Sequence, residues 1–282
     1  MTLASQVKSL AEPSKAPNGT DYLSLSFSAA EKFALSVNRT LKDIEVIALE
    51  NQVIPERYQR NIGTIGIDGQ IKLLNSQVAV VGAGGLGGAA LELLARFGIG
   101  KIVVIDGDVF VDSNLNRQFL SDTSNLGEAK VQAAKQRIET VNPATEVIAY
   151  REFADENSLP SMVQGSQVII DALDSIPLRF SLERIARKMG IPLVHGAIAG
   201  LLGQVMTIFP GDKGLVALYG PGLNSKPGIE KELGTPCVTP VIVASLQVCE
   251  AVKIILGWNT RLRNQTALLN LRESSMEIIE FR

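Results

Sequence analysis

Cysteine and histidine are scarce in this sequence. Its 282 residues include two cysteines, Cys237 and Cys249, and a single histidine, His195. Two thiols cannot supply the four thiolates of a structural zinc site within one chain, and they give no disulfide framework. We therefore expect no zinc site.

Long apolar runs and an excess of positive charge are also missing. No apolar run reaches the ~18–20 residues that span a bilayer, and residues 1–19 lack the apolar core of a signal peptide. Lys and Arg number 27 against 29 Asp and Glu, for a formal net charge of −2. This balance disfavours a nucleic acid as the main partner. We expect a cytoplasmic protein that contacts no membrane.

The first 76 residues are expected to lie outside the main domain. Residues 1–22 are rich in Ser, Pro, Lys and Gly without a sustained period, which indicates a mobile tail. Residues 23–76 are expected to form a helical segment. Its apolar residues recur at three- and four-residue steps from Ser28 to about Ala48 and predict one amphipathic helix there, and a short helix follows around residues 70–74.

A strand, turn, helix and strand follow one another from residue 77. Apolar strands are predicted at residues 77–81 and 101–105, with a glycine-rich turn at 82–88 and a helix at 89–97 between them. The alternation continues to residue 210 and predicts a doubly wound, mainly parallel, Rossmann-like α/β sheet. Residues 211–236 are a long glycine-rich loop, and residues 237–282 a helix and terminal hairpin of the same domain.

Four glycines occupy the turn between the first strand and helix of this unit: Gly82, Gly84, Gly85 and Gly87. Asp106 ends the next strand. Glycines let the backbone approach a ligand, the helix N-terminus favours phosphate, and the carboxylate can accept hydrogen bonds from ribose hydroxyls. An adenine nucleotide is implied, and the motif by itself leaves both NAD and ATP open.

Polar and cationic residues follow Asp106 directly: Asp108, Asn114, Arg117, Gln118 and Lys130. A dinucleotide pyrophosphate needs little beyond the helix N-terminus. A triphosphate instead requires fixed positive charge, which also stabilises the departing pyrophosphate. Arg117 and Lys130 suit that task, so ATP is favoured over NAD. A nicotinamide-dependent oxidoreductase stays an alternative that leaves these cations without a role.

Several motifs in this order resemble the ThiF/MoeB/HesA family of ubiquitin-activating-enzyme-like adenylyltransferases. The run Ser113–Gln118 is similar to the S-N-L-x-R-Q signature of that family. The resemblance covers about residues 57–256 and includes four further motifs: Arg57-Tyr-x-Arg60, G-x-G-G-L-G, Asp171-Ala-Leu-Asp174 and the glycines from Gly196 to Gly203.

The resemblance implies roles for individual residues. Asp106 binds the ribose, Arg117 and Lys130 contact the phosphates, Asn114 and Gln118 line that site, and Asp174 orients Mg²⁺. Arg60 is the arginine that reaches the γ-phosphate from the partner subunit of a homodimer. From the local sequence alone, Asp174 could instead cap the helix that follows it, and Arg60 could be an ordinary surface residue.

The implied reaction is adenylylation of a carboxylate by ATP, with release of pyrophosphate. The substrate carboxylate itself is the nucleophile, and the implied substrate is the C-terminal glycine of a ubiquitin-like protein of the sulfur-carrier type. The loop at residues 211–234 resembles the crossover segment that covers such a tail. A carboxylate on a small molecule or a tRNA base, and a nucleotide-binding module without activity, stay alternatives.

The sequence departs from the family at its cysteines. Many relatives carry two C-x-x-C pairs that bind zinc, and both pairs are absent here. Cys237 falls near the position where some relatives place a cysteine that accepts the activated carrier, so it is a candidate acyl acceptor, although a small buried hydrophobe would fit as well. Cys249 is expected in the core, and His195 is expected to be structural.

Overall fold

The computed structural model describes residues 2–220, 230–259 and 262–281. Its main feature is an eight-stranded sheet with the strand order β11-β10-β9-β8-β7-β4-β5-β6. Five neighbouring strands are parallel: β4 (Gln77–Val81), β5 (Lys101–Ile105), β6 (Glu146–Tyr150), β7 (Val168–Asp171) and β8 (Leu193–Ala199). Three antiparallel strands continue the sheet: β9 (Leu202–Ile208), β10 (Gln265–Asn270) and β11 (Ser275–Glu280). The predicted α/β fold, with its terminal hairpin, is confirmed.

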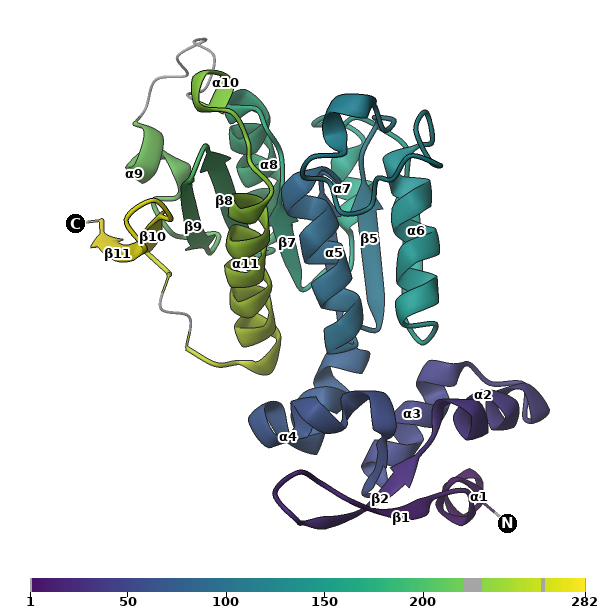
Figure 1. Cartoon of the computed structure of the whole chain (residues 1–282). Coiled ribbons are helices and arrows are strands. Elements are labelled where there is room, and N and C mark those ends of the chain that lie inside the picture. The colour runs from purple at the N-terminus through teal and green to yellow at the C-terminus, as the bar shows by residue number, and fades with distance from the viewer. Residues whose placement is uncertain (1, 221–229, 260–261, 282) are drawn as a thin grey trace.

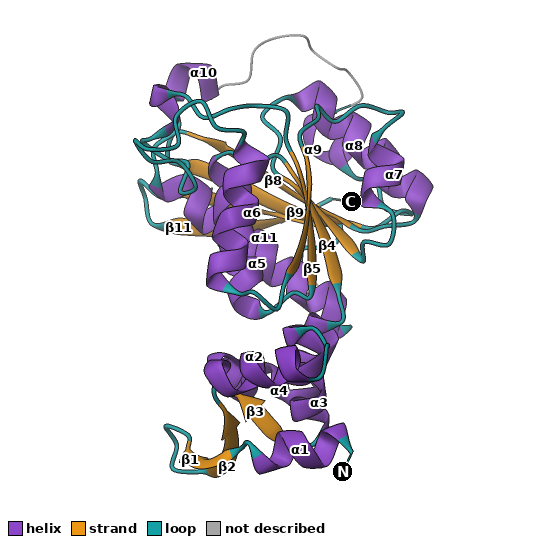
Figure 2. Ribbon diagram, turned by 90° about the vertical axis from the view of Figure 1, so that its right-hand side faces the viewer, coloured by secondary structure: helices purple, strands orange, loops and turns teal. Residues whose placement is uncertain are grey.

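Helices cover both faces of this sheet (Figures 1 and 2). One face carries α5 (Gly85–Phe97), α6 (Lys130–Val141) and α11 (Val238–Leu256), and the other carries α7 (Leu159–Val163) and α8 (Ile176–Met189). Alternate residues of one strand enter the two cores: Val78 and Val80 of β4 pack toward α5, whereas Ala79 and Val81 pack on the opposite side. Burial on both faces explains why these strands are apolar throughout.

Residues 2–55 form a separate small module below the sheet in Figure 1. It contains α1 (Leu3–Ser9), β1 (Glu12–Lys15), β2 (Asp21–Leu25), α2 (Phe27–Ser36), α3 (Leu41–Glu50) and β3 (Val53–Pro55), with the three strands paired in chain order. The expectation of a tail without structure over residues 1–22 is thus corrected. Val7 of α1 and Leu25 of β2 are fully buried in the core of this module, which holds the segment in place.

The single helix expected from Ser28 to about Ala48 is in fact two helices, α2 and α3. Asn38 adopts a positive φ of 51° between them. Thr40 then begins α3 with a capping box, because its hydroxyl accepts from the Asp43 amide at 3.1 Å and the Asp43 carboxylate accepts from the Thr40 amide at 3.2 Å. Such a cap stabilises a new helix start by about 1 kcal/mol, and apolar periodicity alone does not reveal it.

Helix α4 (Gln59–Leu74) joins the module to the sheet and is longer than the short helix expected near residue 70. It bends at Gly66, where φ is 70°. Just before it, Arg57 bonds both sides of the junction: its Nε lies 3.2 Å from Glu45 Oε1 of the module, and its Nη1 donates to Asn142 of the main domain. Asn142 also donates to the buried Tyr58 hydroxyl at 2.9 Å.

The long loop after β9 contains two short helices, α9 (Leu215–Tyr219) and α10 (Glu230–Leu233). Residues 221–229, the middle of the expected crossover segment, lie outside the described residues. The next helix, α11, corrects the expectation that no apolar run could span a bilayer. By length and composition it is sufficiently apolar to do so, and half of its most apolar window is buried against the protein.

Candidate functional site

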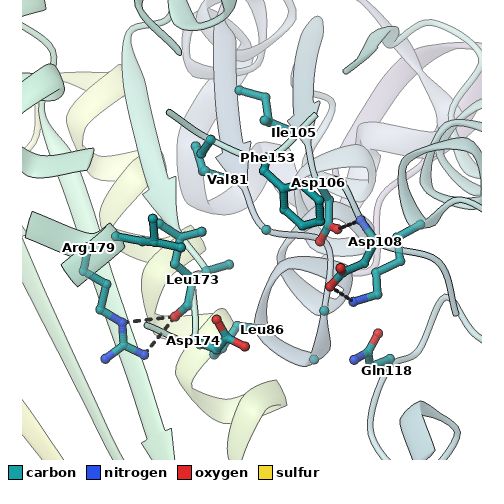
Figure 3. Close-up of a pocket in the computed structure, with 18 of the residues that line it drawn as sticks. Val81, Leu86, Ile105, Asp106, Asp108, Gln118, Phe153, Leu173, Asp174 and Arg179 are labelled. Carbon is teal, nitrogen blue, oxygen red and sulfur yellow. Dashed lines mark hydrogen bonds and ion pairs between the residues drawn. The ribbon is translucent and has the colours of Figure 1, made fainter. Parts of the chain in front are cut away.

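A cavity of about 420 Å³ opens where β4, β5 and β7 end, beside the N-terminus of α5 (Figure 3). The carboxyl ends of parallel strands meet at this edge, which is where doubly wound sheets place their ligands. Nine residues predicted from the sequence line the cavity: Gly82, Gly84, Gly85, Asp106, Asp108, Arg117, Gln118, Lys130 and Asp174. The volume suits a nucleotide-sized ligand.

The glycine turn is tight because two of its residues have no room for a side chain. A Cβ at Gly82, where φ is 99°, would lie 2.6 Å from the Ala172 carbonyl oxygen, and a Cβ at Gly87 would lie 1.8 Å from the Gly82 oxygen. Gly87 therefore packs directly against the backbone of Gly82 and does not line the cavity. Gly84 precedes the first residue of α5, so the positive end of that helix faces the space above.

Asp106 shapes this turn as well as lining the cavity. Its Oδ2 accepts from the Ala83 amide at 2.7 Å, and its Oδ1 accepts from the Asp108 amide at 2.8 Å. One carboxylate thus joins the glycine turn to the loop after β5. Each oxygen retains a lone pair for a ribose hydroxyl.

Two cations enter the cavity from different elements. Lys130, the first residue of α6, has an almost buried side chain whose Nζ lies 3.0 Å from Asp108 Oδ2. Arg117 donates from Nη1 to the Ser113 carbonyl at 2.9 Å and to Asn116 Oδ1 at 2.7 Å, which leaves its other donors for a ligand. This pair provides the fixed positive charge that a polyphosphate requires.

The two amides expected here have different positions. Gln118 is buried at the cavity wall, and its Oε1 has no hydrogen-bond partner within the described structure. A buried acceptor without a partner is costly, so this oxygen suits a donor on a ligand. Asn114 is not among the lining residues. Its Oδ1 accepts from the Val111 amide at 3.1 Å and stabilises the turn at Asp112–Asn114 that presents Arg117.

Asp174 projects into the cavity after β7 (Figure 3). Ser175, not Asp174, is the N-cap residue of α8, and this helix start has no side-chain capping bond. The alternative role as a helix cap is therefore not supported. The described residues contain no cluster of three potential ligands that could hold a metal alone. One carboxylate is nevertheless sufficient for Mg²⁺ when phosphate oxygens and waters complete its shell.

Two of the lining residues that sequence reasoning missed, Phe153 and Arg179, have side chains suited to a role in the site. Phe153 exposes 73% of its surface at the cavity rim, where an aromatic face can stack on a base. Arg179 is buried and donates from Nε and Nη2 to the Leu173 carbonyl at 3.0 and 2.8 Å, which fixes the turn that carries Asp174. The only signal for Arg179 was its position on the first turn of a predicted helix, whereas Phe153 had none.

His195 lies in a buried chain of hydrogen bonds beside the cavity. Its Nδ1 is 2.7 Å from Asp171 Oδ2, and its Nε2 is 3.0 Å from the Tyr219 hydroxyl. Burial lowers the pKa of His195, although the hydrogen bond to Asp171 opposes the shift. His195 does not line the cavity. Its contact with Tyr219, at the end of α9, joins β8 to the long loop, so a structural role fits its contacts.

Arg60 and the two cysteines are not among the residues that line this cavity. Arg60 is in the first turn of α4, at the opposite edge of the sheet. Cys237 is exposed at the N-cap of α11, two residues after Thr235 of the cavity wall. Cys249 is also exposed, which corrects the expectation that it belongs to the core. Twelve positions of one helix separate the thiols by roughly 18 Å, so they cannot share a metal.

Comparison with known proteins agrees with this geometry. The model of the ThiF family matches residues 58–282. The SAMP-activating enzyme E1 of Haloferax volcanii is 34% identical, over 80% of this chain and 85% of that protein. The sulfur carrier protein adenylyltransferase of Thermus thermophilus is 33% identical, over 80% and 87%. The crystal structure of PaaA superposes with a TM-score of 0.68 and 26% identity, over 80% of this chain and 82% of PaaA.

Proposed function

The chain belongs to the ThiF family and is an adenylyltransferase, and from this premise we propose that it activates the C-terminal carboxylate of a ubiquitin-like sulfur carrier protein. The carrier is proposed because the relatives are named for a sulfur carrier protein and for SAMP activation. ATP is the second substrate. A cytoplasmic location is part of the proposal, since the step consumes ATP.

One observation carries the proposal: two cations and a free carboxylate surround a single glycine turn. Arg117 and Lys130 line the cavity beside the N-terminus of α5. Asp174 lines it from the loop after β7 (Figure 3). Three groups of this kind match a triphosphate with its metal and exceed what a dinucleotide requires. The same set therefore argues against a nicotinamide cofactor.

The reaction needs no nucleophile from the protein. The carrier carboxylate attacks the α-phosphorus of ATP, a new C(O)O–P bond forms, and the bond from the α-phosphorus to the β-phosphate bridging oxygen breaks as pyrophosphate leaves. Arg117 and Lys130 stabilise the charge that develops on the departing phosphates. Mg²⁺ held at Asp174 would neutralise further phosphate charge.

Arg60 belongs to this proposal only as a residue acting on a second copy. Strands β4 and β5 each have five residues and so span roughly 16 Å between Arg60's edge of the sheet and the cavity edge. An arginine side chain is much shorter than this. We therefore propose a homodimer in which Arg60 of one chain reaches the γ-phosphate bound by the other.

Exchange of labelled pyrophosphate into ATP tests the proposed function. We expect exchange that depends on Mg²⁺ and on a sulfur carrier protein ending in Gly-Gly, because the adenylylation step is reversible. The matched control is the same carrier without its last glycine, which should support no exchange. Exchange driven only by small acids, or calorimetric binding of NAD without binding of ATP, would contradict the proposal.

A further inference from the structure

A closed ring of hydrogen bonds runs through five residues beside the cavity. His195 Nδ1 lies 2.7 Å from Asp171 Oδ2, and His195 Nε2 lies 3.0 Å from the Tyr219 hydroxyl. Arg179 Nη1 donates to the same hydroxyl at 3.3 Å, and Arg179 Nε and Nη2 donate to the Leu173 carbonyl at 3.0 and 2.8 Å. The Leu173 amide donates to Asp171 Oδ1 at 3.0 Å and closes the circle. We call these five residues the Leu173 ring.

The Tyr219 hydroxyl is the point at which most hydrogen bonds of the Leu173 ring meet. The Asp171 carboxylate accepts, so His195 donates to it from Nδ1. The Tyr219 oxygen accepts from Arg179 and from Gln204 Nε2, which occupies both of its lone pairs. Its own proton is therefore donated to His195 Nε2. Removal of this one hydroxyl would break three hydrogen bonds at once.

The Leu173 ring holds the peptide bond that leads into Asp174 (Figure 3). The Leu173 carbonyl oxygen belongs to that peptide bond, whose atoms lie in one plane with the Cα of Asp174. Two hydrogen bonds from Arg179 therefore fix the orientation of this plane. The Asp174 side chain makes no hydrogen bond within the part of the chain that the structure describes. The direction of its carboxylate thus depends on the backbone that the ring holds.

Tyr219 lies on the side of the Leu173 ring that is remote from the first cavity. It does not line the cavity that contains Asp174, and it lines a second cavity of about 450 Å³ instead. Arg179 and Ile198 line both cavities, so the ring lies where the two meet. An effect of Tyr219 on the nucleotide site must therefore pass through Arg179.

We propose that Tyr219 is a positioning residue for Asp174. Its hydroxyl holds Arg179, and Arg179 holds the peptide bond that sets the direction of the Asp174 carboxylate toward Mg²⁺ and the phosphates. The proposal rests on the proposed function for the role of Asp174. A purely structural ring would only anchor the end of α9 to the sheet. The two roles differ in whether loss of the hydroxyl changes the binding of ATP with its metal.

Calorimetric titration of the full chain with ATP, with and without Mg²⁺, tests the proposal without a carrier. Tyr219→Phe removes the hydroxyl and keeps the aromatic side chain. We expect normal affinity of this variant for ATP alone, because the glycine turn and the cations are unchanged. The gain in affinity that Mg²⁺ provides should fall about 10-fold, as when an outer-shell partner of a metal ligand is lost. No gain in the unmodified protein, or an equal gain in the variant, would overturn the proposal.

Tyr150→Phe is the matched control. Tyr150 ends β6 and is partly buried, and its hydroxyl makes no hydrogen bond within the described residues. This variant should retain the full gain from Mg²⁺, and melting temperatures show whether each variant is folded. If Tyr219→Phe does not fold, Arg179→Lys takes its place, because it keeps the charge and loses the fork that holds the Leu173 carbonyl. A normal gain in Arg179→Lys would also overturn the proposal.

Pyrophosphate exchange separates this inference from the proposed function. Tyr219→Phe should lower exchange about 10-fold. If Tyr219 acts through Asp174, adding Tyr219→Phe to Asp174→Asn should cause no further loss, whereas independent effects would multiply. A multiplied loss would overturn the proposal. Absence of exchange in every form, with the expected calorimetric results, would contradict the proposed function and leave the role of Tyr219 intact.

Discussion

At the residue scale, Asp174 is the residue for which a catalytic role can be separated most clearly from a structural one. It lines the cavity, and no hydrogen bond or ion pair of its side chain appears within the described structure. Replacing the carboxylate by an isosteric amide should therefore leave folding almost unchanged. In the proposed mechanism, the variant loses the charge that would hold Mg²⁺ against the phosphates.

Asp174→Asn should lower the rate of pyrophosphate exchange by about 10²–10³, the usual effect of removing one such electrostatic contact. The measurement is exchange over a range of Mg²⁺ concentrations, together with the melting temperature. Ser175→Ala is the matched control, because Ser175 starts α8 without a capping bond and should keep normal exchange. Near-normal activity of Asp174→Asn at limiting Mg²⁺ would remove the residue from the mechanism.

Glu45 predicts a pH dependence of stability. Burial raises its pKa from 4.5 to about 7, although Arg57 lowers it in part. The folded protein thus binds this proton more tightly than the unfolded chain. The stabilisation that protonated Glu45 gives the folded state is therefore complete below pH 4.5 and is lost as the pH rises through about 7. The full effect is on the order of 3 kcal/mol in the free energy of unfolding.

The contribution of Glu45 to the free energy of unfolding is measured by denaturant unfolding of Glu45→Gln and of the unmodified protein, each at about pH 5 and about pH 7.5. Relative to the variant, the unmodified protein should be more stable at the lower pH and lose that advantage at the higher one. Glu50→Gln, at the exposed end of the same helix, controls for the charge removed from α3. A difference between Glu45→Gln and the unmodified protein that does not change with pH would contradict the account.

At the residue scale, the sequence predicted which residues meet but not how each is used. Nine predicted residues line the cavity because they follow the carboxyl ends of parallel strands, which topology brings to one edge. The orientation of a side chain depends on contacts that spacing does not encode. Asn114 therefore stabilises its own turn, and Phe153 enters the cavity from a loop without a recognisable motif.

At the scale of elements, the start of α11 brings Cys237 close to the cavity, although Cys237 is not among the residues that line it. The thiol is exposed at the N-cap, and Thr235 is the nearest residue of that segment in the cavity wall. Because the carrier carboxylate is the nucleophile, Cys237→Ser should retain pyrophosphate exchange even where it blocks a later transfer to the thiol.

Exchange and transfer are measured separately, the second by thiol-sensitive gels of the enzyme after incubation with carrier and ATP. Cys249→Ser is the matched control, since this second exposed cysteine is twelve positions farther along the helix. Loss of exchange in folded Cys237→Ser would place the thiol among the adenylylation residues.

The elements of the sheet were predictable because buried parallel strands are continuous apolar runs and glycines mark the turn to α5. The module at residues 2–55 was not. Its strands are short, and β1 is Glu-Pro-Ser-Lys, a sequence with little strand propensity that is held by pairing with β2. Tertiary contacts of this kind override the local pattern on which sequence reasoning depends.

At the scale of the whole molecule, the role proposed for Arg60 requires two chains for one complete site. Complementation between Arg60→Ala and Asp174→Ala tests this directly. In a mixed dimer, delivery of the arginine across the interface leaves one site with both residues and the other with neither. Exchange should therefore return, to at most about a quarter of normal if subunits mix randomly.

The control is a mixture of Asp174→Ala with Lys130→Ala, whose residues lie in the same cavity of one chain. That mixed dimer has one defect in each site and should stay inactive. Recovery of activity in the control, or no recovery with Arg60→Ala after proven subunit exchange, would mean that Arg60 does not act across the interface.

The central claim is that AMP is transferred to the carboxylate of a carrier, and the intact mass of the carrier tests it most directly. After incubation with enzyme, ATP and Mg²⁺, with pyrophosphatase added to prevent reversal, the account predicts a carrier heavier by one adenylyl group. The added mass should disappear with Asp174→Asn or with a carrier that lacks its last glycine. An unmodified carrier, with AMP found instead on the enzyme or on a small acid, would contradict the account.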